Sequence, residues 1–316
     1  MSEGGIVRVS RHSSIHPHTP PRVDIRPAGK ADLLTRSRGL TARDAEVLSY
    51  LARHRVLTAL QLARLVFGSY SHARSRLAVL HERGVLARFR RDIWPGSQPW
   101  RYTLGPIGAI VHAAATGAAL PRPATVTETV LRLAHSAHTE HRLGVNDFFA
   151  TLAGHSQHHD GRALGEWWPE NEVGATCAGI VRPDGYGEYS DHDRTLGFFY
   201  EYDTGTETLD TLVEKVGKYA ELADAGICKP ILFHLPSASR EHHFHAAVTR
   251  RWPVKPPVPI ATMPADQLAP PGHHIAAASP SIVDALWRPI GHTRRRTLAD
   301  LAPRTTRQPT ARTDAA

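Results

Sequence analysis

The sequence predicts a two-domain α+β protein in which a small, basic helical domain precedes a larger domain of mixed α and β structure. Its 316 residues are enough for two ordinary hydrophobic cores. The apolar pattern over residues 40–104 is that of three helices and two strands, whereas residues 127–290 alternate between helical and strand patterns. The net charge, counted from Lys, Arg, Asp and Glu, is +7 over residues 40–104 and −7 over residues 105–252. A basic module is therefore followed by an acidic one.

The two ends of the chain carry no apolar periodicity. Residues 1–39 and 303–316 are predicted to be disordered tails, the first of them basic. The two cysteines, Cys177 and Cys228, are too few for a disulfide framework. The sequence shows no signal-peptide pattern and no apolar run long enough to span a bilayer, so we expect a cytoplasmic protein without a membrane partner.

Residues 40–120 are predicted to form the first domain. Thr41 can cap a helix, with Asp44 three residues later as in a capping box. Thr58 caps a second, short helix, and Ser71 opens a third. Two strand-like runs, "VLARFRR" and "PWRYTL", follow and are joined by a loop with Pro and Gly. Three helices followed by a hairpin predict a winged helix-turn-helix.

The third helix and the hairpin carry the candidate contacts to double-stranded DNA. The helix would enter the major groove, and the hairpin arginines would reach the phosphate backbone. The candidate DNA-binding residues are His72, Arg74, Ser75 and Arg76 in the helix and Arg88, Arg90, Arg91 and Arg101 in the hairpin. Winged helices also bind proteins, but the net charge of +7 favours DNA. Because such domains often dimerise on symmetric sites, a homodimer stays open.

The second domain, predicted over residues 127–290, places acidic residues in apolar strands. In "LGFFYEYDTGTE", Glu201 and Asp203 lie on one face of a strand, and Asp184 of "RPDG" lies on the preceding strand. Buried carboxylates require compensation, and a hard divalent cation supplies it. We therefore predict a site for Mg²⁺ or Mn²⁺. Its candidate ligands are Asp184, Glu201 and, from the first helix of the domain, Glu140.

The order of these motifs resembles a known family. A helix, "PD", an "ExD" strand and a further helix resemble the PD-(D/E)XK nuclease-like fold, a mixed sheet flanked by helices. With the winged helix and with "HRLGVNDFF", "YEYDTGTE" and "KVGKYAEL" in that order, residues 40–290 resemble the replication-relaxation family. The resemblance implies DNA binding in plasmid or mobile-element replication or mobilisation. It also implies the role in relaxing or nicking DNA that is proposed for the family.

One position departs from the nuclease pattern. The pattern has a lysine two residues after the glutamate, but this sequence has Asp203 there. Lys215 on the next helix can take the place of that lysine, and it shares a helix face with Tyr219. Lys218 is the second candidate for the role of this lysine. The candidate catalytic residues are Asp184, Glu201, Asp203 and Lys215. Alternatively, these lysines form ordinary solvated helix pairs. The function thus stays open between a metal-dependent DNA nickase and a non-catalytic replication or transcription regulator with a degenerate nuclease-like domain.

Two histidine motifs resemble those of other enzyme classes. "HTE" at residues 138–140 lacks the P-C-x-x-C that a zinc deaminase requires. "HFH" at residues 243–245 is similar to the metal-binding motif of tyrosine relaxases, but here it falls in a predicted helix, where alternate residues diverge. His141 matches the helix motif of the family, and a structural histidine is its expected role.

Overall fold

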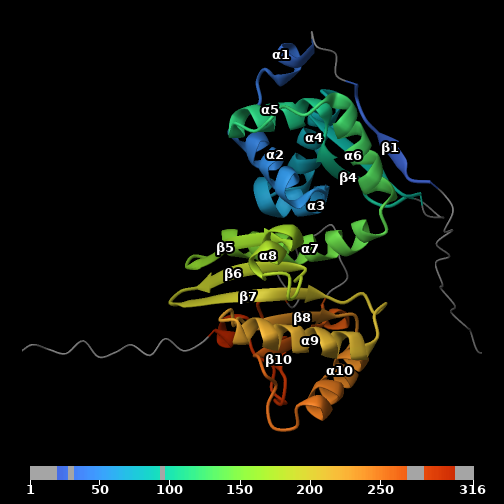
Figure 1. Ribbon diagram of the computed structural model, residues 1–316. Helices are drawn as coiled ribbons and strands as arrows, with labels where there is room; N and C mark the ends of the chain where they lie inside the picture. The colour runs from blue at the N-terminus through green and yellow to red at the C-terminus, as the bar shows by residue number, and fades with distance from the viewer. Residues whose placement is uncertain (1–19, 28–31, 93–96, 269–280, 303–316) are drawn as a thin grey trace, which may run out of the picture. The chain divides into compact units, whose positions relative to one another are not determined.

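The computed structural model describes residues 20–27, 32–92, 97–268 and 281–302, and Figure 1 traces the chain. The protein is of mixed α/β structure, with two separate sheets, and it forms two compact units. Unit 1 holds the described residues up to Ala59 together with Ser71–Thr139. Unit 2 holds Leu60–Tyr70 and the described residues from Glu140 onward.

Unit 1 combines helices with an antiparallel sheet. Its helices are α1 (Asp32–Ser37), α2 (Ala42–His54), α4 (Tyr70–Glu82), α5 (Pro106–Thr116) and α6 (Pro123–His135). Its strands are β1 (Arg22–Asp24), β2 (Leu57–Thr58), β3 (Leu86–Arg90) and β4 (Arg101–Leu104), in the sheet order β1-β3-β4-β2. The first and third predicted helices and the predicted hairpin are therefore present as α2, α4 and the β3–β4 pair.

The start of α2 is the capping box that the sequence predicts. The Thr41 backbone N–H donates to Asp44 Oδ2 over 2.7 Å, and the Asp44 N–H donates to Thr41 Oγ1 over 3.2 Å. The same carboxylate also binds Arg76 of α4, with 2.8 Å between Nε and Oδ1. Burial raises the pKa of Asp44, but the hydrogen bonds from Arg76 and Thr41 outweigh it and hold the pKa below its usual value. One side chain thus caps α2 and joins it to α4.

Strand β1 corrects the prediction of a disordered tail through residue 39. It pairs antiparallel with β3, with Val23 opposite Phe89 and Asp24 opposite Arg88. Helix α1 also falls inside that predicted tail. A strand of three residues is too short to show the period-two pattern from which strands are predicted. Residues 1–19, 28–31 and 303–316 of the two predicted tails lie outside the described residues.

Unit 2 is built on a six-stranded mixed sheet in the order β10-β9-β8-β7-β6-β5. Its strands are β5 (Arg162–Pro169), β6 (Gly185–Asp191), β7 (Arg194–Tyr202), β8 (Ile231–Leu235), β9 (Ile260–Pro264) and β10 (Arg288–Pro289). Its helical elements are α3 (Ala59–Leu62) with the π-helical turn η1 (Ala63–Phe67), α7 (His138–Gln157), α8 (Glu170–Thr176), α9 (Leu209–Asp224), α10 (Ala238–Arg251), and the 3₁₀ turns η2 (Ala265–Gln267) and η3 (Ala299–Leu301). Strands β7, β8 and β9 run parallel, and the other pairs are antiparallel.

Alternation along β7 divides the core of unit 2 between the two faces of the sheet. On one face, Phe199 belongs to a buried cluster with side chains of β8, α8, α9 and α10, and Figure 1 shows α9 and α10 beside each other. On the opposite face, Tyr200 stacks on Phe148 of α7, with ring centroids 4.0 Å apart. The fully buried Trp287 meets Phe148 edge-on. The sheet is therefore covered on both sides.

A glycine brings α7 close to the end of β7. A Cβ atom placed on Gly144 would lie 2.1 Å from the ring of Tyr202, a distance that excludes any side chain there. The close approach brings His141, one turn earlier on α7, against the same tyrosine ring, with centroids 5.6 Å apart.

Three predicted boundaries differ from the structure of the second domain. The strand predicted over "ALGEWWPENEV" ends at Pro169, and α8 begins at Glu170, because the proline precedes the helix and acidic residues fill its first turn. Residues predicted as a linker before Thr127 begin α6, with Pro123 in its first turn. The predicted end at residue 290 is also too early, because η3 and the buried Leu298 follow it.

Candidate functional site

Glu201, near the end of β7, is the centre of the candidate site. Its side chain is buried, and both of its oxygens accept hydrogen bonds from α9: Oε2 from Lys215 Nζ and Oε1 from the hydroxyl of Tyr219. Lys215 and Tyr219 are one helical turn apart, so the prediction that they share a face of this helix is confirmed. Lys218, the reserve candidate, is exposed. The structure therefore brings the proposed substitute lysine to the acid.

Asp184 comes directly before β6 and lies next to the end of β7. Its Oδ2 accepts the backbone N–H of Tyr202 over 2.8 Å, and its Oδ1 pairs with His141 Nε2 over 3.1 Å. The Asp184 side chain is mostly buried, with 15 % exposed. Elements from three parts of the sequence, α7, β7 and α9, thus meet around Asp184 and Glu201.

The charges of these groups influence one another. Burial, reinforced by the nearby Asp184, raises the pKa of Glu201 to about 8, although Lys215 acts in the opposite direction. The pKa of Lys215 is raised because the attraction of Glu201 and Asp184 outweighs its burial. The pKa of Asp184 is lowered, since His141 and Lys215 outweigh burial, and the pKa of His141 is raised by Asp184 against burial. The raised pKa of Glu201 thus results from burial and from the neighbouring carboxylate, whereas the contact with Lys215 favours the ionised form.

The donor set fits a divalent cation in part. Asp184 and Glu201 are two carboxylates close enough to perturb each other, and Mg²⁺ is often held by one or two carboxylates together with waters and substrate phosphates. Each of their oxygens already accepts one hydrogen bond but retains a second lone pair. Within the described residues, no three or more His, Cys, Asp or Glu side chains form a metal-binding group, so Glu140, which is exposed on α7, does not complete such a set.

Asp203 lies on the same face of the sheet as Glu201 but is bound elsewhere. Arg240 of α10 donates to both of its carboxylate oxygens, and the Gly205 N–H donates to Oδ1 over 2.8 Å. The Asp203 side chain is 2 % exposed. Arg240 was not among the predicted site residues, because nothing in the sequence links an arginine 37 residues away to this acid. At the position where the nuclease pattern has lysine, the protein has Asp203, whose charge is compensated by Arg240.

A buried pair lies on the opposite face of the same strands. The side chains of Tyr200 and His234 are joined by a hydrogen bond of 2.8 Å between Oη and Nδ1. Burial lowers the pKa of His234 to about 4 and raises that of Tyr200. His234 is therefore neutral in the folded protein at neutral pH.

We expect His234 to make the protein less stable as the pH falls from 6.5 towards 4. Its pKa is lower in the folded than in the unfolded chain, so unfolding takes up a proton in this window and the stabilisation is lost on acidification. The free energy of unfolding should change by ~1.4 kcal/mol per pH unit for this one group. Glu201 acts in the opposite direction, so the comparison is between wild type and His234→Gln, measured by urea unfolding between pH 6.5 and 4.5. Equal pH slopes would contradict the assignment.

The candidate DNA-binding residues of α4 differ in their availability. His72, Arg74 and Ser75 are exposed. Arg76 is half-buried and bound to Asp44, so its guanidinium already has a structural task. Three of the four candidates on α4 are therefore exposed, and the fourth is bound within the unit.

The hairpin arginines differ in a similar way. Arg88 binds Asp24 over 2.9 Å, and both Arg88 and Arg90 lie over the ring of Trp100, 4.3 and 4.4 Å from its centroid. Arg91 is half-buried. Arg101 is only 4 % exposed and donates to Gln98, so this side chain is not positioned to reach a phosphate. The two histidines of "HFH" lie in α10, as the sequence predicts.

The chain was compared with models of known protein families. The model of the replication-relaxation family matches residues 48–233, which is more than half of the chain. The protein belongs to the replication-relaxation family. Its membership indicates a role in replication or relaxation. Searches of curated proteins and of solved structures gave no match. Among the described residues, no helix combines the length and apolar character that crossing a bilayer requires.

Proposed function

We propose that this chain is a cytoplasmic DNA-binding protein of plasmid or mobile-element replication or mobilisation, and that unit 2 nicks DNA with bound Mg²⁺ or Mn²⁺. The observation that carries the proposal is the contact of Lys215 with Glu201 beside Asp184. These are the residue types of a PD-(D/E)XK site, with the lysine supplied by the following helix. Family membership supports the connection to replication and relaxation.

The topology of unit 2 supports a nuclease-like fold. Asp184 stands before β6, Glu201 stands at the end of the antiparallel neighbour β7, and α9 connects β7 to the parallel strand β8. In this arrangement both acids lie at one end of adjacent strands, and α9, the helix that follows, brings the ammonium group of Lys215 to Glu201. The departure at Asp203 is compensated because Arg240 neutralises that acid and Lys215 takes the vacant role.

The residues of this site have distinct tasks in the proposed reaction. Asp184 and Glu201 would hold the metal, which when bound supplies charge stabilisation to the phosphate and acidifies a water. Lys215 provides a fixed positive charge beside the scissile phosphate. Tyr219 orients Glu201 through its hydroxyl, and His141 orients Asp184, so these two are positioning residues.

In this proposal, α2, α4 and the β3–β4 hairpin of unit 1 belong to a winged helix that binds double-stranded DNA. Their order along the chain supports it, as does the exposure of His72, Arg74 and Ser75 on α4. The net charge of +7 over residues 40–104 supplies the electrostatic attraction to phosphates. The proposed DNA contacts do not include Arg76, which binds Asp44, or Arg101, which is buried.

We expect Arg74→Gln to weaken DNA binding and to reduce the slope of log K against log salt by about 0.9, the value for one phosphate contact. Fluorescence anisotropy with a labelled duplex at several salt concentrations measures both quantities. Arg132→Gln is the matched control, because it removes one exposed arginine from α6 of the same unit. If both variants bind with the same slope as wild type, the assignment of α4 is wrong.

The nicking activity is tested with supercoiled plasmid. With Mg²⁺ or Mn²⁺ present, the purified protein should convert supercoiled plasmid to open circles, and a chelator should prevent the conversion. A second candidate function is a non-catalytic regulator that binds DNA. It is favoured by the fact that each oxygen of Asp184 and Glu201 already has a protein donor. DNA binding without open circles in either metal would select this alternative.

A further inference from the structure

A basic cavity lies in unit 2, where the residues after β10 meet the start of β7. Its volume is about 790 Å³, and its lining includes Arg194, His292 and three consecutive arginines, Arg294, Arg295 and Arg296. Arg194 opens β7, whereas Glu201 lies seven residues further along the same strand, roughly 23 Å away. The cavity is therefore separate from the carboxylate site. Most of its lining lies C-terminal to the residues that match the family model.

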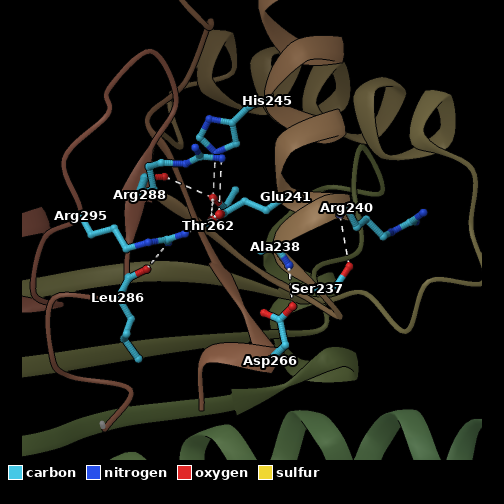
Figure 2. A network of polar contacts seen from close by, with 10 residues as sticks. All are labelled: Ser237, Ala238, Arg240, Glu241, His245, Thr262, Asp266, Leu286, Arg288 and Arg295. Atoms are coloured by element: carbon cyan, nitrogen blue, oxygen red, sulfur yellow. Dashed lines mark hydrogen bonds and ion pairs between the residues drawn. The ribbon is translucent and has the colours of Figure 1, made fainter. Parts of the chain in front are cut away.

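Two of the lining arginines are fixed by acidic partners. Arg295 binds both oxygens of Glu241 and donates to the carbonyl of Leu286 over 2.6 Å. Figure 2 shows Arg295, Arg288 and Thr262 converging on the fully buried Glu241 of α10. Arg194 binds Asp300 over 2.6 Å. These contacts use the charges of Arg194 and Arg295 to hold the walls of the cavity in place.

The remaining lining cations have no such partner. Arg294 and Arg296 are exposed, and the described residues contain no ion pair or hydrogen bond to either guanidinium. The backbone that carries them is nonetheless fixed. Trp287 and Arg296 exchange backbone hydrogen bonds of 3.1 and 2.7 Å, and the Leu298 N–H donates to the carbonyl of Val283 over 3.0 Å. Two uncompensated guanidinium groups are thus held on a rigid segment at a concave surface.

We propose that this cavity binds backbone phosphates of a DNA strand. Guanidinium groups match phosphate geometry with paired N–H donors, and the hydroxyl of Thr293 adds a further donor in the lining. The volume of about 790 Å³ exceeds what a single phosphate needs and lies in the range of pockets that enclose larger ligands. The inference rests on the proposed DNA binding, but not on nicking. It gives unit 2 a contact with DNA of its own.

The test replaces the two uncompensated arginines together, as Arg294→Gln/Arg296→Gln. Fluorescence anisotropy of the full chain with a labelled duplex should show weaker binding and a salt slope reduced by about 1.8, the loss of two phosphate contacts. Arg250→Gln/Lys255→Gln is the matched control, because it removes two exposed cations from the same unit outside the cavity. Its slope should stay that of wild type. Arg294→Lys/Arg296→Lys should restore most of the slope, because the charge is kept.

Other outcomes overturn the inference. If the glutamine pair and its control have equal slopes while wild type binds DNA, the cavity does not contact the duplex, but the proposed DNA binding stands. If calorimetry shows inorganic phosphate binding to wild type and not to the glutamine pair, with unchanged DNA slopes, the cavity serves a small phosphate ligand. If wild type binds no DNA at any salt concentration, the proposed function fails and this inference fails with it. Urea unfolding midpoints equal to wild type exclude misfolding of the variants.

Discussion

Glu201→Gln is expected to lower metal-dependent nicking of supercoiled plasmid at least about a hundredfold, because a bound metal contributes several kcal/mol of charge stabilisation. Glutamine keeps the shape of the side chain and one acceptor oxygen, so Tyr219 retains a partner. The substitution removes the negative charge with which the Glu201 carboxylate would hold Mg²⁺. Initial rates of open-circle formation at saturating Mg²⁺ measure the effect.

Lys215→Ala is expected to have a comparable effect, since removing one preorganised group that stabilises the transition state costs ~10²–10³ in rate. Lys218→Ala is the matched control: it lies on the same helix, is exposed, and should nick as fast as wild type. DNA affinity measured in chelator should be close to wild type for both variants, which separates chemistry from binding. If the Lys215 and Lys218 variants lose equal activity, the lysine acts only through net charge and the site assignment fails.

Arg240→Met is expected to destabilise unit 2 by ~3–5 kcal/mol, the typical cost of leaving a buried charge without its partner. Asp203 is the charge in question: its side chain is 2 % exposed, and Arg240 donates to both of its oxygens. Urea unfolding, followed by circular dichroism, gives the change from the shift in midpoint at constant slope.

Two further variants control this result. Arg240→Met/Asp203→Asn should recover most of the lost stability, because no buried charge then remains uncompensated. Arg250→Met, an exposed position on the same helix, should stay within about 0.5 kcal/mol of wild type. A double variant as unstable as Arg240→Met alone would show that Arg240 acts by packing and not by its charge.

Features that depend on neighbours in sequence could be predicted from the chain alone. The Thr41–Asp44 capping box and the shared face of Lys215 and Tyr219 follow from helix geometry, and the structure has both. The alternation that places Phe199 and Glu201 on one face of β7 follows from strand geometry. The approach of α9 to Glu201 was a hypothesis about tertiary structure, and it depended on the resemblance and not on periodicity.

Features that depend on partners distant in sequence could not be predicted. Arg240 and Asp203 are 37 residues apart, and Arg76 and Asp44 are 32 apart, so no local pattern connects them. Consequently, Arg76 was assigned to DNA although it binds an acid of its own unit. The start of α8 is different. Pro169 with acidic residues in the next turn is a helix signal that was present in the sequence and was outweighed by the apolar run before it.

The buried position of Trp287 and the ion pair between Arg295 and Glu241 bear on how the protein is shortened for expression. A clone ending at residue 290, where the sequence pattern fades, would keep Glu241 but delete the arginine that binds both of its oxygens. It would also delete Leu298, which is fully buried. Such a product should be prone to aggregation, whereas one that extends through Ala302 retains both the ion pair of Arg295 with Glu241 and the buried Leu298.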